Sequence, residues 1–261
     1  MLTAALACFC FVLGLVIGSF LNVVIWRVPR GESVVRPPSH CPRCDTEISP
    51  RDNVPVLSWL LLRGRCRHCG EPISARYPAV ELLTGAVFAG LAVRFGYDEA
   101  LPAFLYLGAV CVALALIDLD TRRLPNALTL PSYVVGIVLL GGAALLQGEP
   151  RLLLRALGGM AAMYGFYLLL VLINDKGMGF GDVKLAGVLG LHLGWLGWPQ
   201  VGVGTFMGFL VGGLYGIAAM LIGKATRKTK VPYGPFMVVG AFVSIWAGGA
   251  IWDAYAGISG L

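Results

Sequence analysis

Eight apolar runs, most of them close to twenty residues long, constrain what this chain can fold into. They cover roughly residues 2–25, 78–95, 101–118, 126–147, 154–173, 183–198, 200–222 and 233–252. A helix needs about 20 apolar residues to cross a bilayer. The whole chain is 57% hydrophobic and only 13% charged. The sequence therefore predicts an all-α polytopic membrane protein with about eight membrane helices.

Two of these runs need separate interpretation. The run at 183–198 is short, carries His192 and several glycines, and could lie re-entrant, which would leave seven spanning helices. The first run has no basic residue before it and no small-residue cleavage site after it, unlike a signal peptide. We therefore expect the first run to remain as a membrane anchor.

One sizeable polar stretch, residues 27–77, interrupts the apolar pattern. It contains nine Arg and both Cys-x-x-Cys pairs of the chain. This composition predicts three parts: a first membrane helix at 1–26, a small cytoplasmic module at 27–77, and a membrane-embedded domain at 78–261.

Basic residues predict the orientation of the chain. If the polar stretch is cytoplasmic, alternation of the runs puts 17 of the 20 Lys and Arg on the cytoplasmic side, as the positive-inside rule requires. They are the nine Arg of residues 27–77 with Arg122, Arg123, Lys176, Lys184, Lys224, Arg227, Lys228 and Lys230. Membrane topology then explains the net charge of +6. We expect these residues to meet anionic lipid and expect no nucleic-acid partner.

The polar stretch also carries a metal-binding pattern. Its two pairs are Cys41-Pro42-Arg43-Cys44 and Cys66-Arg67-His68-Cys69, separated by 21 residues, slightly more than the usual interval of about 15 to 20 in zinc ribbons. Four thiolates at such spacing can surround Zn²⁺ in a closed structural site. A redox pair is a competing interpretation, and so is a ligand set that includes His40 or His68. Because cytoplasmic thiols stay reduced, we predict structural zinc on Cys41, Cys44, Cys66 and Cys69.

Two carboxylates lie at the ends of apolar runs. Asp118 ends one run, and Asp182 follows glycines and opens another. Topology places both on the cytoplasmic face, where a pair of carboxyls can share a proton and activate water. The negative end of a helix dipole should make Asp118 hold its proton, and a positive end should make Asp182 ionise easily. Taken singly, Asp182 could also be an N-cap, and Asp118 an ordinary interface charge.

The chain resembles the type IV prepilin leader peptidases in several separate motifs. The first is Gly179-Phe180-Gly181-Asp182, a GxGD element, and the second is Ile117-Asp118 ahead of Leu124-Pro125-Asn126. The stretches 18–29 and 76–82 are similar to the bacterial members. A GxGD element alone would be weak, but the ordered combination is specific.

The resemblance implies an aspartic endopeptidase of the bacterial inner membrane. Family members cut the basic leader from type IV prepilins and type II secretion pseudopilins, between a Gly and usually a Phe, on the cytoplasmic side. The family's catalytic aspartates correspond to Asp118 and Asp182, with Gly179 and Gly181 in the catalytic-loop motif. This chemistry needs no covalent intermediate and no catalytic metal.

The resemblance also implies a second activity, methylation of the new N-terminus with S-adenosylmethionine. The sequence has no Gly-x-Gly-x-x-Gly strand turn, the usual mark of a dinucleotide-type fold, so no cofactor-binding residue is predicted. Two other classes remain as alternatives. A transporter would explain intramembrane Asp and glycine-rich helices, although the halves show no self-similarity, and a zinc-containing scaffold would explain the cysteines without catalysis.

Overall fold

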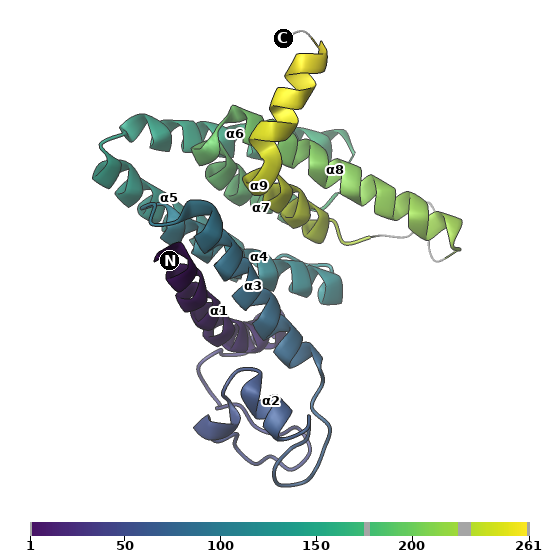
Figure 1. Ribbon diagram of the computed structural model, residues 1–261. Coiled ribbons are helices and arrows are strands. Elements are labelled where there is room, and N and C mark those ends of the chain that lie inside the picture. Colours follow the sequence, from purple (N-terminus) through teal and green to yellow (C-terminus); the bar gives the residue numbers. More distant parts are fainter. Residues whose placement is uncertain (1, 175–177, 224–230, 260–261) are drawn as a thin grey trace. The chain divides into compact units, whose positions relative to one another are not determined.

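The computed structural model describes residues 2–174, 178–223 and 231–259 of the chain, and in these ranges the fold is helical (Figure 1). The helices are α1 (Leu2–Arg27), α2 (Leu57–Leu61), α3 (Arg76–Phe95), α4 (Leu101–Thr121), α5 (Asn126–Gln147), α6 (Pro150–Ile173), α7 (Phe180–Leu196), α8 (Trp198–Leu221) and α9 (Gly234–Ser259). Short 3-10 helices lie at Val28–Arg30 and Pro50–Asp52. No strand is present in the described ranges; isolated bridges join His40 to Glu47 and Arg65 to Pro72.

Seven of the described helices are long and apolar enough to cross a membrane, which confirms the predicted class of helical membrane protein. They are α1, α3, α4, α5, α6, α8 and α9. The short sixth run of the sequence forms α7, which has 17 residues. Most of its side chains are buried by protein, including every residue from Leu185 to Trp195. Lys176 and the basic residues Lys224, Arg227, Lys228 and Lys230, used above for orientation, lie outside the described residues.

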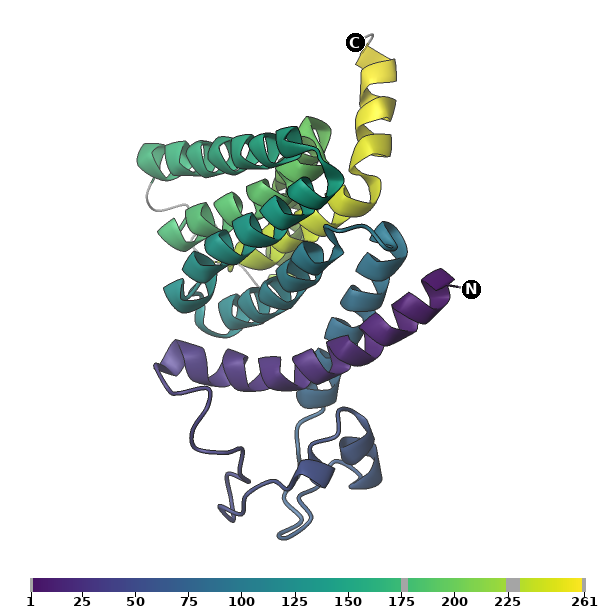
Figure 2. The same ribbon diagram turned by 90° about the vertical axis from the view of Figure 1, so that its left-hand side faces the viewer.

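The chain divides into two compact units, residues 1–113 and 114–261. The domain bounds predicted from the sequence, with breaks after residues 26 and 77, stay a prediction. In the first unit, α1 and α3 pack against each other and cross in the view of Figure 2. A Cβ at Gly14 would lie 2.7 Å from the Cα of Gly85, and one at Gly18 would lie 2.7 Å from the Cα of Glu81. These two helix backbones therefore touch directly, as small residues permit.

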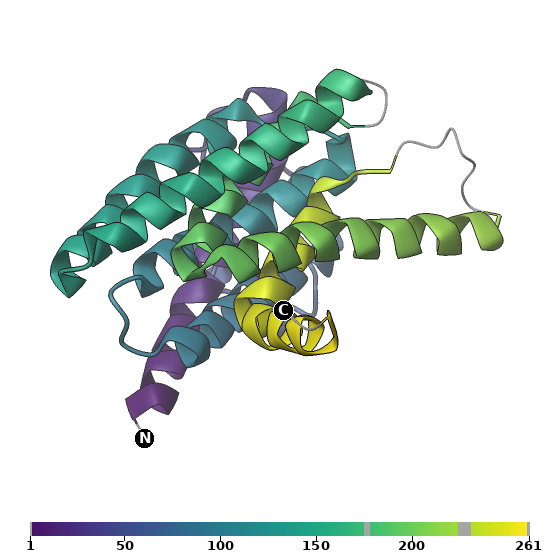
Figure 3. The ribbon, with the colours of Figure 1, turned by 90° about the horizontal axis from the view of Figure 1, so that it is seen from above.

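The second unit packs its helices around α7. α6 runs alongside α5 in the view from above (Figure 3), and it also contacts α7. A Cβ at Gly190 of α7 would lie 2.4 Å from the carbonyl oxygen of Gly159 in α6, and one at Gly187 would meet the hydroxyl of Tyr133 in α5. α8 and α9 pack in the same manner through Gly208 and Gly240. Glycine contacts thus bring α7 close to α5 and α6, and α8 close to α9.

Candidate active site and metal centre

Asp118 lies in the last turn of α4. The helix ends three residues later at Thr121; the N–H of the next residue, Arg122, bonds to the Asp118 carbonyl at 2.8 Å, and Arg122 adopts a φ of 54°. The Asp118 side chain is buried, 5% exposed, whereas Asp120 is exposed. An apolar helix ending in a charged turn explains this placement, because Ile117 is wholly buried beside the carboxylate. The position in the last helical turn is the one predicted from the sequence.

A backbone N–H from a distant segment contacts the Asp118 carboxylate. Gly234 begins α9, and its N–H donates to Oδ2 of Asp118 at 2.9 Å. The first N–H groups of a helix have no partner within the helix and carry a partial positive charge. This donor therefore holds the Asp118 carboxyl group against the start of α9. The sequence around Asp118 gives no sign of this contact with Gly234, although Pro235 after a glycine is a helix-start signal.

Asp182 lies in the first turn of α7 and is 8% exposed. Gly179 is the N-cap residue, and Asp182 is the third helical residue. The N–H of Gly179 donates to Oδ2 of Asp182 at 3.0 Å, while the N–H of Asp182 donates to the Gly179 carbonyl at 3.0 Å. The carboxylate therefore accepts a capping hydrogen bond without being the N-cap itself.

The pKa of Asp182 differs from the expectation for a helix start. The pKa of Asp182 is raised to about 6: burial raises it most, the Gly179 N–H lowers it in part, and the negative charge of Asp118 also raises it. The sequence interpretation predicted easy ionisation from the dipole alone, and this was wrong because desolvation of the carboxylate outweighs the hydrogen bond. The effect of Asp118 on Asp182 also means that the two carboxylates interact.

Contacts between neighbouring segments hold the two carboxylates in one region of the second unit. A Cβ at Gly181 would lie 3.0 Å from the Cβ of Leu124, so the GxGD turn lies against the chain that follows α4. Lys184 Nζ donates to Oδ1 of Asn126, the first residue of α5, at 2.6 Å. The ends of α4, α5, α7 and α9 therefore meet around Asp118 and Asp182.

Aromatic side chains pack next to Gly234. The rings of Tyr167 and Phe209 stack with centroids 5.6 Å apart, and Tyr233 lies 5.5 Å from Phe209. The hydroxyls of Tyr167 and Tyr233 are 3.5 Å apart. Because Tyr233 precedes Gly234 in the chain, these rings fix the start of α9 and with it the N–H donor to Asp118.

The four cysteines of the polar stretch at residues 27–77, called the polar insert from here on, lie together. Their sulfur atoms are all within 4.8 Å of one another, and Sγ of Cys41 lies 3.7 Å from Sγ of Cys69. Sulfurs bound tetrahedrally to zinc at about 2.3 Å are about 3.8 Å apart, so the cluster could hold such an ion. Neither His40 nor His68 belongs to the group. All seven cysteines are free thiols in the structure.

Each Cys-x-x-Cys pair occupies the same kind of turn. The Cys41 N–H bonds to Thr46 O at 3.0 Å and the Cys66 N–H to Glu71 O at 2.8 Å. Bonds from Asp45 to Cys41 O and from Gly70 to Cys66 O close the two turns. The equivalent positions are 25 residues apart throughout, so the insert consists of two copies of one knuckle. Arg67 and Asp52 brace it through an ion pair at 2.6 Å.

Glu81 connects this insert to α3. It lies in the second turn of α3, is 7% exposed, and its Oε2 accepts the Val56 N–H at 2.7 Å. Its side chain is also hydrogen-bonded to Ser19 of α1. Glu81 therefore links α3 both to α1 and to the insert.

Comparison with known proteins places these features in a family. Residues 12–95 match the model of the bacterial peptidase A24 N-terminal domain, and residues 105–217 match that of the type IV leader peptidase family. A prepilin leader peptidase/N-methyltransferase of Aeromonas hydrophila is 38% identical, over 92% of this chain and 90% of its own length. Proteins of the same name from Myxococcus xanthus and Neisseria gonorrhoeae are 42% and 35% identical, over 86% and 93% of this chain and 67% and 91% of their own lengths. No solved structure matched.

The membrane helices and these matches define an integral membrane enzyme of the peptidase class. The chain belongs to the type IV leader peptidase family.

Proposed function

We propose that this chain removes the leader peptide from type IV prepilins and that Asp118 and Asp182 activate the attacking water. The observation that carries the proposal is the burial of both carboxylates where the ends of α4, α5, α7 and α9 meet. Two interacting carboxyls can divide the roles of acid and base between them.

In this mechanism one carboxylate takes a proton from water, and the resulting hydroxide attacks the carbonyl carbon of the scissile bond. The other carboxyl donates its proton to the carbonyl oxygen. The tetrahedral intermediate then expels the amine, which leaves with a proton returned from the first carboxyl, while the second carboxyl takes back its proton from a hydroxyl of the intermediate as the new carboxylic acid forms. A pKa near 6 for Asp182 suits this exchange, because the group can both hold and release a proton near neutrality. The Gly234 N–H would keep the Asp118 carboxylate oriented.

The site would face the cytoplasm of the bacterial inner membrane. The excess of Lys and Arg at one set of helix ends supports this sidedness. A prepilin would then enter with its apolar helix among the membrane helices and its basic leader on the cytoplasmic side. Pseudopilins of type II secretion share this chemistry, and we propose them as substrates too.

We propose methylation of the newly exposed N-terminal amine as the second activity, in line with the name of the relatives. S-adenosylmethionine would supply the methyl group. The amine nitrogen would form a bond to the methyl carbon as the bond from that carbon to sulfur breaks, which leaves a neutral thioether, and the amine would release one proton to water.

We further propose that Cys41, Cys44, Cys66 and Cys69 hold one structural Zn²⁺, because their sulfur separations fit that ion.

The test is cleavage of a purified prepilin by wild type, Asp118→Asn and Asp182→Asn, followed by mass spectrometry of leader loss and methyl addition. We expect either substitution to reduce the cleavage rate by at least about 10²-fold, as for loss of an acid or base group. Asp120→Asn, an exposed neighbour, is the matched control and should cleave normally. Normal turnover by either folded active-site variant would exclude the carboxylate pair and favour a scaffold.

A further inference from the structure

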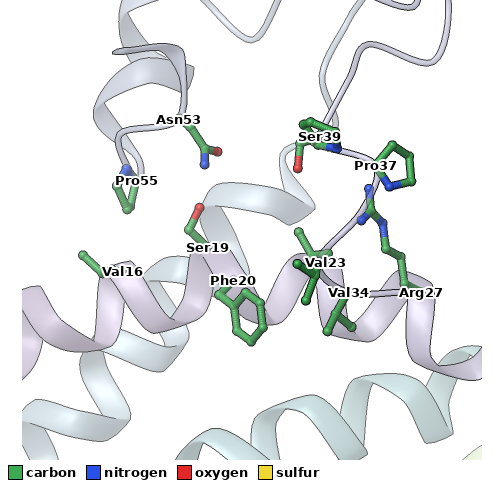
Figure 4. Close-up of a pocket in the computed structure, with 12 residues that line it drawn as sticks. Val16, Ser19, Phe20, Val23, Arg27, Val34, Pro37, Ser39, Asn53 and Pro55 are labelled. Atoms are coloured by element: carbon green, nitrogen blue, oxygen red, sulfur yellow. The ribbon is translucent and has the colours of Figure 1, made fainter. Parts of the chain in front are cut away.

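A pocket of about 400 Å³ lies within the first unit, between α1 and the polar insert (Figure 4). This volume is within the range of about 300 to 1,000 Å³ usual for small-molecule sites. Its walls are largely apolar, and the polar residues that line it are Ser19, Arg27, Ser39 and Asn53. Figure 4 shows Ser19, Ser39 and Asn53 pointing toward the same gap from opposite sides. Apolar walls with a few convergent polar groups are typical of cofactor sites.

Arg27 makes one end of this pocket positive. The side chain is 9% exposed and rises from α1 toward Pro37 (Figure 4). Its Nη1 donates to the Ser33 carbonyl at 3.0 Å, and none of the ion pairs found among the described residues includes it. A buried guanidinium without an anion is costly, and Arg binds carboxylates through two parallel hydrogen bonds. This end of the pocket is therefore suited to a carboxylate or phosphate.

A buried carboxylate lies behind the other end. Ser19 is eight residues before Arg27 on α1, which is about 12 Å along a helix. The Ser19 side chain is hydrogen-bonded to Glu81, which is 7% exposed. A negative charge at this end favours a positive group in the pocket. The matching ligand is a small molecule with a carboxylate, an apolar body and a positive charge.

We propose that this pocket binds S-adenosylmethionine, with its carboxylate at Arg27, its sulfonium toward Ser19 and Glu81, and its adenosine among the apolar walls. The inference rests on the methylation activity proposed above and assigns it a binding site. Arg27 matches the carboxylate, Ser19 with Glu81 behind it matches the sulfonium, and the apolar walls match the adenosine. An anionic lipid offers the same negative group and is the competing occupant.

The test measures binding of tritiated S-adenosylmethionine to the purified full chain in phosphatidylcholine nanodiscs. Wild type should bind one equivalent saturably, and ultraviolet cross-linking should label peptides within residues 16–55. Arg27→Gln should raise the dissociation constant at least about tenfold, as expected for loss of a charged hydrogen bond. Arg30→Gln is the matched control, because Arg30 is exposed in the 3-10 helix that follows α1 and stacks over Trp26 at 3.6 Å. It should bind like wild type.

A second variant tests the same pocket in case Arg27→Gln does not fold. Ser39→Trp fills the pocket without changing charge and should also weaken binding at least tenfold. Wild-type affinity in either folded variant, or a cross-link within residues 114–261, overturns the proposal. Displacement of the tritiated ligand by phosphatidylglycerol nanodiscs, with the lipid bound through Arg27, overturns it in favour of lipid.

The two proposals fail in different ways. Asp118→Asn should lose leader cleavage and keep S-adenosylmethionine binding. If wild type cleaves and methylates but Arg27→Gln binds normally, the methyl donor site lies elsewhere and the peptidase proposal stands. If wild type cleaves but neither binds the donor nor adds a methyl group, both the proposed methylation activity and the proposed binding site are contradicted. If Asp118→Asn cleaves normally while Arg27→Gln fails to bind S-adenosylmethionine, only the carboxylate mechanism is contradicted.

Discussion

Gly234 and Asp118 are 116 residues apart in the chain, yet the N–H of Gly234 lies 2.9 Å from the Asp118 carboxylate. A Cβ at Gly234 would also lie 2.9 Å from Oδ2 of Asp118, closer than a side chain tolerates. The start of α9 and the end of α4 are thus in contact through a hydrogen bond that requires a glycine.

This contact predicts the effect of Gly234→Ala. The added methyl group should push the Asp118 carboxylate from its hydrogen bond and reduce the leader-cleavage rate at least about tenfold, since small displacements of catalytic groups have large effects. Gly257→Ala in the same helix meets nothing within 4 Å and should cleave normally. Equal cleavage rates in the two variants would show that the Gly234 contact does not position Asp118.

The raised pKa of Asp182 predicts a pH-dependent stability. The folded group binds its proton up to about pH 6, whereas an unfolded Asp releases it near pH 4. Its contribution to stability is therefore greatest below pH 4 and is lost as pH rises through 6. Asp182→Asn should raise the free energy of unfolding at pH 8 by up to about 3 kcal/mol, and this gain should vanish at pH 4. Thermal unfolding at both pH values measures it, with Asp120→Asn as control. A gain of the same size at both pH values would contradict the assigned cause.

Metal analysis tests the cysteine cluster. Wild type purified without chelator should contain about one zinc per chain, and Cys66→Ser should lose most of it because the closed site would have three thiolates. Cys8→Ser changes an exposed free thiol in α1 and should leave the zinc content unchanged. Less than half an equivalent in wild type would contradict the proposed zinc site.

Glycine contacts between α8 and α9 predict a further stability effect. A Cβ at Gly240 would lie 2.4 Å from the Gly208 nitrogen, so Gly240→Ala should separate the helices and lower the free energy of unfolding by about 1 to 3 kcal/mol. Gly216→Ala in α8 meets nothing within 4 Å and should stabilise by up to about 1 kcal/mol through helix propensity. Thermal unfolding in one detergent compares the two, and a stabilised Gly240→Ala would exclude the close packing.

Local features of the sequence predicted much of the fold. Hydropathy gave a first helix over 2–25 and one over 78–95, and the structure has Leu2–Arg27 and Arg76–Phe95. The 25-residue repeat of the two cysteine knuckles is also visible in the sequence, although it was not recognised there. Membrane-spanning helices and turns can be predicted from the sequence because the residues that determine them are close together along the chain.

The sequence by itself determined the apolar helices, the four clustered cysteines, and the positions of Asp118 and Asp182 at helix ends. Only the tertiary structure decided that Gly234 donates to Asp118, that Glu81 connects the insert to α3, and that burial raises the pKa of Asp182. These relationships depend on which helix ends meet and how much water remains there. Interhelical glycine contacts set both, and residue spacing along the chain does not encode them.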